Sequence, residues 1–149
     1  MANQAFFHEA MATTYSLKFP ELESSEAQDI AEQCFHVLDE LESKLSRFIP
    51  DSDVYRINNM HANSSMLLEE EVHECLKAAI EISGHTDGHF DIGTAELSDI
   101  YRGLQAGLLN EFEYDQAIQT ALAEKAEGSL YVSPDEPMVH CFTPGIKID

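Results

Sequence analysis

Two short segments, LSRFIPDS at residues 45–52 and TDGHFD at residues 86–91, carry the most information about this chain. They flank a stretch whose apolar residues recur at helical spacing, so we expect two loops at either end of a helix. The loops and the residues beside them offer aromatic rings, hydroxyls, an amide and a carboxylate. This mixture suits a flat polar ligand better than packing alone, and it predicts a ligand cleft between residues 46–58 and residues 86–91.

Individual side chains of the two loops have two interpretations. Phe48 and Tyr55 can stack on an aromatic ring, and Asp91 can accept a hydrogen bond from a sugar hydroxyl or a ring N–H. The alternative is that Phe48 and Phe90 are anchors of the hydrophobic core, which is the commoner fate of single aromatic residues. The sequence leaves both interpretations open.

Outward from the loops, the spacing of apolar residues predicts an α+β protein. Ser25, followed three positions later by Gln28, is typical of a capping box at the start of the first helix. Ser52 is the expected N-cap of a short helix, and residues 69–71 place negative charge at the start of the next one. Helices are expected over residues 25–45, 52–58, 69–83, 95–104 and 114–125, and strands over residues 13–19, 130–132, 138–140 and 146–148.

Length and composition indicate one globular domain spanning residues 1–149, since 44% of the residues are hydrophobic and 24% are charged. Cys34, Cys75 and Cys141 have no metal-type spacing and favour a reducing compartment. The N-terminus lacks a basic start and a sustained apolar segment, so we expect no signal peptide and a cytoplasmic protein. No run approaches the roughly 20 apolar residues of a membrane span.

The charge is strongly acidic, with 28 acidic and 8 basic residues and a net charge of −20. Long-range repulsion therefore makes nucleic acid and anionic membranes poor partners. The simplest interpretation of this charge is a solvated, aggregation-resistant surface. If the ligand is a dinucleotide, its phosphates need helix N-termini, backbone amides or a divalent cation.

A metal site is a second interpretation of residues 85–91, which contain two histidines and two carboxylates. His85 and His89 are able to bind zinc if the loop folds back on itself. However, Gly88 between them disfavours the helix that would align both imidazoles, and a solvated helix terminus is the simpler interpretation. We therefore expect no metal ligands in the chain, and no motif in it identifies a catalytic nucleophile.

Four pieces of the sequence, in order, resemble the N-terminal half of the FAD:protein FMN transferases, the ApbE-like flavin transferases. Residues 11–13 (MAT) are similar to the opening Met-Gly-Thr of that family, and residues 45–52 with Ile57 and Asn58 resemble its aromatic loop. Residues 86–91 are similar to its Thr-x-Gly-x-Phe-Asp motif, and residues 145–149 (GIKID) resemble the start of a strand that leads to a glycine loop. The fold implied is the family's T-fold-related mixed sheet with packed helices, incomplete at the C-terminus.

The resemblance also implies a function and a set of site residues. Family members use Mg²⁺ to transfer FMN from bound FAD to a threonine of an acceptor flavoprotein, with release of AMP. By this resemblance FAD is bound in a pocket lined by Met11 and Phe48, the flavin nucleotide is held by His89, Phe90 and Asp91, and Asp149 contacts it from the last strand. The resemblance identifies no catalytic residue, and it places the Mg²⁺ ligands beyond the end of this chain.

Some positions depart from the family pattern: Ala12 replaces a glycine, His89 stands where a small residue is usual, and residues 92–93 (IG) replace Pro-Thr. These variations are tolerable, but the chain ends before the family's glycine-rich loop and the residues that hold the magnesium, so we expect a truncated or degenerate flavin transferase that is inactive or very poor alone. The alternative is a non-catalytic module that binds flavin or a partner protein. In that case the strand expected at residues 146–148 leaves an open sheet edge, which a homodimer would complete.

Overall fold

The computed structural model describes residues 4–149, a range that contains five helices and five strands. The expected α+β class is confirmed. The elements, in chain order, are β1 (Gln4–Ala10), β2 (Thr13–Phe19), α1 (Ser24–Leu45), α2 (Asp53–Asn58), β3 (Ser64–Leu67), α3 (Glu70–His85), α4 (Ala95–Gln105), α5 (Glu111–Glu127), β4 (Ser129–Val132) and β5 (Met138–Thr143).

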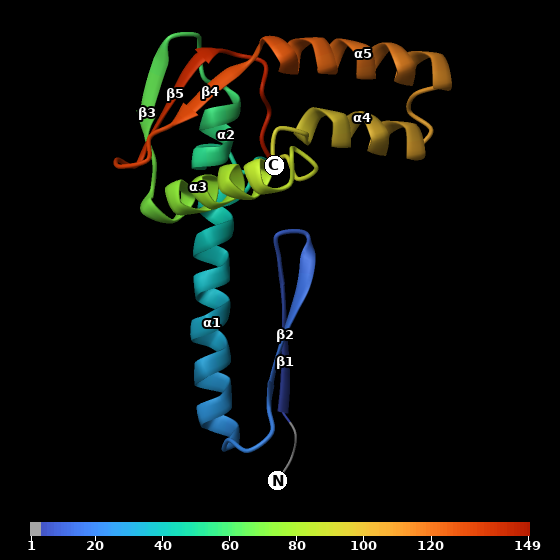
Figure 1. Ribbon diagram of the computed structural model, residues 1–149. Coiled ribbons are helices and arrows are strands. Elements are labelled where there is room, and N and C mark those ends of the chain that lie inside the picture. The colour runs from blue at the N-terminus through green and yellow to red at the C-terminus, as the bar shows by residue number, and fades with distance from the viewer. Residues whose placement is uncertain (1–3) are drawn as a thin grey trace.

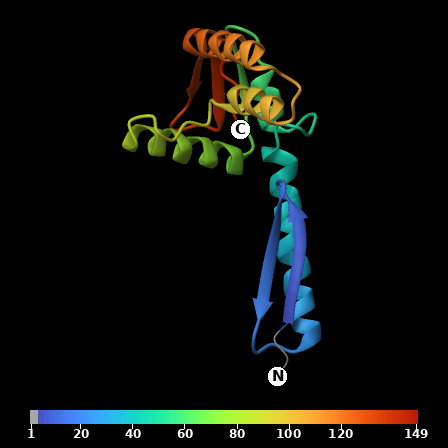
Figure 2. The same cartoon turned by 90° about the vertical axis from the view of Figure 1, so that its right-hand side faces the viewer.

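The molecule has a packed body and a projecting arm (Figure 1). The arm, residues 4–41, consists of the antiparallel β1–β2 hairpin lying along most of α1, and a view turned by 90° shows the same arrangement (Figure 2). The hairpin runs parallel to the helix with its tip toward the body, so the turn between β1 and β2 lies near the C-terminal end of α1.

Small buried residues hold the arm together. Ala27 and Ala31 face the hairpin at 0% and 1% exposure, and the absence of larger side chains lets the helix and strands approach closely. The His8 ring stacks on Phe35 at 4.7 Å between centroids, and its Nε2 lies 2.6 Å from Asp39 Oδ1. Within residues 4–149, no helix, α1 included, combines the length and apolar character needed to cross a bilayer.

The body is built on a three-stranded antiparallel sheet in the order β3-β5-β4. Its central strand, β5, places Val139 and Cys141 at 1% exposure, because alternate residues of a strand face the same side. The helices α2 and α3 pack against that face. The resulting core consists of Val54, Ile57, Leu68, Val72, Leu76, Val139 and Ile148.

Local signals in the sequence explain where several helices begin. The Ser52 side chain accepts a hydrogen bond from Tyr55 N at 3.0 Å, which confirms the expected N-cap of α2. Asn110 and Glu113 form a capping box at the start of α5. The capping box expected at Ser25 is wrong: α1 begins at Ser24 without a side-chain cap, and the Ser24 hydroxyl donates instead to Gln4 of the hairpin.

No pattern in the sequence predicts β1, and the loop expected at residues 62–65 is wrong in part, because β3 begins at Ser64. Both strands exist because of a partner distant in sequence. β1 pairs with β2 from Gln4–Phe19 to Ala10–Thr13, and β3 pairs with β5 from Ser64–Cys141 to Leu67–Met138. Neither short strand has enough alternation of its own to predict it.

The strand expected at residues 146–148 is also wrong, because this segment joins no sheet. Its backbone bonds to residues 92–95 instead: Lys147 O accepts from Ala95 N at 3.2 Å, and Asp149 N donates to Ile92 O at 3.0 Å. The open sheet edge expected at this segment is therefore absent from the described residues. The chain passes close to the C-terminal end of α5 at Gly145, where a Cβ would overlap the carbonyl oxygen of Glu124.

Asn58 fastens this terminal segment to the body. Its Nδ2 donates to Ile148 O at 2.9 Å and its Oδ1 accepts from Ile148 N at 2.8 Å, so one side chain replaces a strand partner. Ile148 is 4% exposed, and its backbone groups have little access to water.

We expect Asn58→Ala to lower the free energy of unfolding by about 1–3 kcal/mol, because two hydrogen bonds are lost and buried backbone groups are left unpaired. Urea unfolding followed by circular dichroism measures this loss. Asn59→Ala is the matched control, since Asn59 is exposed and donates only within α2 to Tyr55 O. Equal stability of the two variants would show that Asn58 does not anchor the segment.

Candidate functional site

A cavity of about 740 Å³ lies where the tip of the hairpin meets the C-terminal end of α1. We call it the hairpin cavity. It brings together Met11, Phe48 and Asp149, three of the site residues expected from the sequence, although they come from the β1–β2 turn, the loop after α1 and the end of the chain. Its wall consists of Met11, Ala12, Glu42, Leu45, Ser46, Arg47, Phe48, Ile49, Arg102 and Asp149.

The β1–β2 turn holds Met11 in an unusual conformation. Met11 and Ala12 have φ values of 50° and 56°, the left-handed region that residues with a Cβ rarely adopt. Two such residues form the tight hairpin turn that matches strand twist. Met11 N donates to Glu42 Oε1 at 2.9 Å, which ties the turn to α1. Strained backbone of this kind is typical of functional sites, where the exact position of a side chain such as Met11 is kept at a cost in folding stability.

Phe48 is an exposed ring on the wall of the hairpin cavity. Its side chain is 66% exposed, which excludes the interpretation of Phe48 as a core anchor. The guanidinium carbon of Arg47 lies 4.1 Å from the ring centroid, a cation–π contact that fixes one face of the ring. Tyr55 lies in a different, smaller cavity beside Asn58, so Phe48 and Tyr55 do not form one stacking platform.

Arg47 joins three parts of the chain at this cavity. Its two terminal nitrogens bind Asp99 of α4 in a bidentate pair at 2.7 and 2.6 Å, and its Nε donates to Asp149 Oδ1 at 2.9 Å. The Arg47 side chain is only 9% exposed, whereas those of its two partners are 49% and 40% exposed. Charge-assisted bidentate pairs of this kind are stronger than neutral hydrogen bonds and fix the geometry of both partners.

The ion pairs shift the pKa values of the groups involved. The hydrogen bond from Arg47 lowers the pKa of Asp99 below its ordinary value, and the bond to Asp99 raises the pKa of Arg47. Asp91 behaves in the same way, because the hydrogen bond from Lys125 is the largest cause that lowers its pKa. All three groups are therefore charged at neutral pH, and the carboxylates act as acceptors.

The loop at residues 86–91 does not reach the hairpin cavity. Phe90 is 41% exposed, so it is not a core anchor, and it lines neither the hairpin cavity nor the second cavity described below. His89 is exposed and donates its backbone N–H to Thr86 O at 3.0 Å. The cleft expected between the two loops is thus not one shared cavity, because each loop faces a different part of the molecule.

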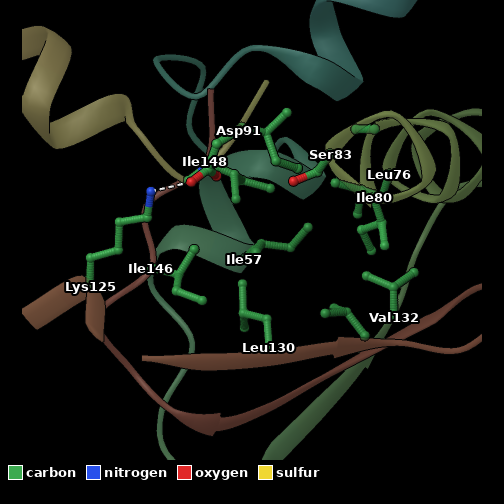
Figure 3. Close-up of a pocket in the computed structure, with 14 residues that line it drawn as sticks. Ile57, Leu76, Ile80, Ser83, Asp91, Lys125, Leu130, Val132, Ile146 and Ile148 are labelled. Atoms are coloured by element: carbon green, nitrogen blue, oxygen red, sulfur yellow. Dashed lines mark hydrogen bonds and ion pairs between the residues drawn. The ribbon is translucent and has the colours of Figure 1, made fainter. Parts of the chain in front are cut away.

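A second cavity, the inner cavity, lies between α3 and the β4–β5 strands and has a volume of about 300 Å³ (Figure 3). Isoleucine, leucine and valine side chains from the sheet and from α3 point into it. Asp91 lies at its rim, where its carboxylate pairs with Lys125 and accepts from Gly93 N at 2.7 Å. The inner cavity is therefore apolar with one polar edge, whereas the hairpin cavity is mixed in character.

The sequence missed Arg47 and Asp99 as site residues. Arg47 stands inside the aromatic loop motif, but its partners lie 52 and 102 positions away, so the sequence offers no local signal for the pairing. The zinc site considered for His85 and His89 is not formed: among residues 4–149, the group of histidine and acidic side chains that converges as metal ligands do lies on α3 instead.

Comparison with known families identifies the class of protein. The model of the ApbE family matches residues 11–148 of this chain. The chain belongs to the ApbE family. No curated protein sequence matches it.

Solved structures of ApbE proteins share the fold. An ApbE protein from Thermotoga maritima is similar with a TM-score of 0.75 and 22% identity over 99% of this chain and 47% of the solved chain. The apo flavinyl transferase ApbE from Pseudomonas stutzeri is similar with a TM-score of 0.70 and 23% identity over 99% of this chain and 44% of the solved chain. The flavin transferase ApbE from Vibrio cholerae is similar with a TM-score of 0.70 and 17% identity over 99% of this chain and 48% of the solved chain. The chain spans about half the length of these solved chains.

The lowered pKa of Asp99 predicts a pH dependence of stability. A carboxylate whose folded-state pKa is depressed stabilises the fold above its unfolded-state pKa of about 3.9, and this contribution is lost as the pH falls through the lower folded-state pKa. Since 49% of the Asp99 side chain is exposed, solvent screening limits the contribution to about 0.2–1 kcal/mol.

We expect Asp99→Asn to lower the free energy of unfolding at neutral pH by that amount and to make it vary less with pH below about pH 4. Urea unfolding at a series of pH values measures both effects. Asp115→Asn, an exposed position on α5, is the control. A pH profile of Asp99→Asn that coincides with that of the unsubstituted chain would refute the assignment.

Proposed function

We propose that the chain is the N-terminal part of one ApbE-like domain and supplies the FAD pocket of an FAD:protein FMN transferase. The hairpin cavity is the observation that carries this proposal. Three positions that the family resemblance assigns to FAD binding, Met11, Phe48 and Asp149, line it together. The relatives in Pseudomonas stutzeri and Vibrio cholerae are described as flavinyl or flavin transferases.

The chemistry of the hairpin cavity supports a ligand with a flat ring and a phosphate group. Phe48 offers an exposed aromatic face, Met11 offers a polarisable thioether, and both favour stacking on a ring system. Two of the three arginines in the sequence, Arg47 and Arg102, also line the cavity, in a chain whose net charge is −20. Arg102, whose side chain is 59% exposed, is the better candidate to attract a pyrophosphate, because Arg47 is already paired with two aspartates. Asp149 is placed to accept a hydrogen bond.

The reaction is a phosphoryl transfer. A threonine hydroxyl oxygen of the acceptor flavoprotein forms a bond to the FMN phosphorus, the bond from that phosphorus to the AMP oxygen breaks, and AMP leaves while the hydroxyl gives up its proton. Arg102 and Phe48 would bind and orient the dinucleotide for this step, and Arg47 would hold the Phe48 ring in place. We assign no residue of this chain as the base, and His89, Phe90 and Asp91 remain proposed contacts to the nucleotide.

Mg²⁺ does not fit onto the described residues of the hairpin cavity. The carboxylates nearest to it are paired, Asp99 and Asp149 with Arg47, and Glu42 with Met11 N. Among residues 4–149, no group of three convergent acidic or histidine ligands includes any residue of the cavity wall. We therefore propose that the Mg²⁺ ligands come from the part of the family domain that this chain does not span.

Phe48→Ala tests the ring-stacking role. Loss of an exposed stacking face should weaken FAD binding by about twofold to thirteenfold, because an aromatic pair contributes about 0.5–1.5 kcal/mol. Quenching of flavin fluorescence on titration with protein measures the affinity. Phe112→Ala removes another exposed ring, 70% exposed on α5, and should leave the affinity unchanged. If the two variants bind FAD equally well, Phe48 is not part of the flavin site.

A transfer assay tests the proposed division of labour. When the 149-residue chain is incubated with FAD, Mg²⁺ and a threonine-containing acceptor flavoprotein, we expect no covalent flavin on the acceptor, because a phosphoryl transfer site without its cation loses its main electrostatic stabilisation. In-gel flavin fluorescence is the measurement. Robust labelling by this chain alone would show that the catalytic groups lie within residues 1–149.

A non-catalytic module that binds flavin or a partner protein is the second candidate. The observation that favours it is that the chain spans about half the length of the solved ApbE chains. It predicts saturable FAD binding together with a homodimer in light scattering. A monomer that binds FAD would favour the transferase portion over this module.

A further inference from the structure

His73 on α3 is buried but only half satisfied. It is 2% exposed, and its Nε2 lies 2.6 Å from the backbone oxygen of Ser133, which follows β4. Among residues 4–149, the Nδ1 atom of His73 is the one buried side-chain nitrogen or oxygen without a hydrogen-bond partner. A buried polar atom without a partner costs stability, so its retention calls for an explanation.

Two carboxylates lie close to the His73 ring. Glu70 and Glu74 lie on the same helix, three residues before and one residue after His73, and one ligand atom from each of the three side chains lies within 4.8 Å of the others. The distance from His73 Nδ1 to Glu74 Oε1 is 3.9 Å, too long for a hydrogen bond. The three ligand atoms are therefore close enough to share one ion.

The bond to Ser133 fixes the form of the ring. A carbonyl oxygen only accepts, so Nε2 must carry the proton, and in the neutral imidazole Nδ1 then presents its lone pair. Histidines that bind metals almost always donate their other ring N–H to a carbonyl or carboxylate in this way. His73 thus has the protonation and the supporting contact of a metal ligand.

We infer that Glu70, His73 and Glu74 form a binding site for a divalent transition metal, with Zn²⁺ as the best match. One neutral imidazole and two carboxylates are ligands that zinc accepts, and three protein ligands leave a fourth position for water. The two carboxylates balance the charge of the ion. None of the three residues lines the hairpin cavity or the inner cavity, so the site is separate from the proposed flavin site.

Metal binding at this position orients the His73 ring, which links α3 to the residue after β4. The ion holds the His73 ring, and the ring holds Ser133 at the end of β4, so the bound form of the body resists opening. One cation competes with the metal: Lys77 Nζ lies 2.6 Å from Glu74 Oε1. Binding requires Lys77 to release Glu74, which is feasible because both groups are at the surface.

Calorimetric titration with zinc chloride tests the site. The full chain carries Cys34→Ser and Cys75→Ser in every sample, because these exposed thiols also bind zinc. We expect one zinc per chain and a rise in melting temperature with zinc concentration. The double variant Glu70→Gln and Glu74→Gln should lose affinity by about tenfold or more. His73 itself is left unchanged because its replacement threatens the core.

Glu81→Gln, an exposed carboxylate on the same helix, is the matched control and should bind zinc as the parent does. Titration with Co²⁺ supplies a second measurement, since Co²⁺ bound with four ligands has strong visible absorption bands. The double variant should lack these bands. The inference is overturned if the parent binds no zinc saturably, or if the double variant and Glu81→Gln bind it equally well.

Discussion

The arrangement of the hairpin cavity depends on the guanidinium group of Arg47. This nearly buried cation binds Asp99 of α4 and Asp149 of the terminal segment, and it also covers one face of Phe48. Three segments that share no strand or helix are thereby held at one point. Because the side chains of both partners are 40–49% exposed, each ion pair contributes modestly to stability, but the two pairs together restrict how far these segments move relative to one another.

Much of the fold could be predicted because its signals are local. The cap at Ser52 and the acidic first turn of α3 are set by residues within a few positions of each other, and the structure shows both. The strands β1 and β3 could not be predicted, since they are stabilised by pairing with β2 and β5 and not by their own composition. Residues 146–148 look like a strand in isolation, but the Asn58 side chain supplies the backbone partners that a neighbouring strand would otherwise provide.

The candidate site follows the same division. Family motifs indicated Met11, Phe48 and Asp149, and the structure places all three at one cavity. The ion pairs of Arg47 with Asp99 and Asp149 could not be predicted, because they join residues far apart in the chain. The motif at residues 86–91 was expected to share that cavity, yet Asp91 instead pairs with Lys125 of α5 at the rim of the inner cavity. His73 escaped notice because its lone pair becomes significant only when its burial and its bond to Ser133 are known.

The arm and the body differ in how firmly they are built. Within residues 4–41 the fully buried apolar residues are all alanines, Ala10, Ala27 and Ala31, whereas the core of the body contains valine, leucine and isoleucine. Amide protons of the hairpin should therefore exchange with solvent through openings that leave the body intact. Met11 lies at the tip of that less stable unit. A ligand that contacts both Met11 and the opposite wall of the cavity near Arg47 would therefore use part of its binding free energy to order the arm.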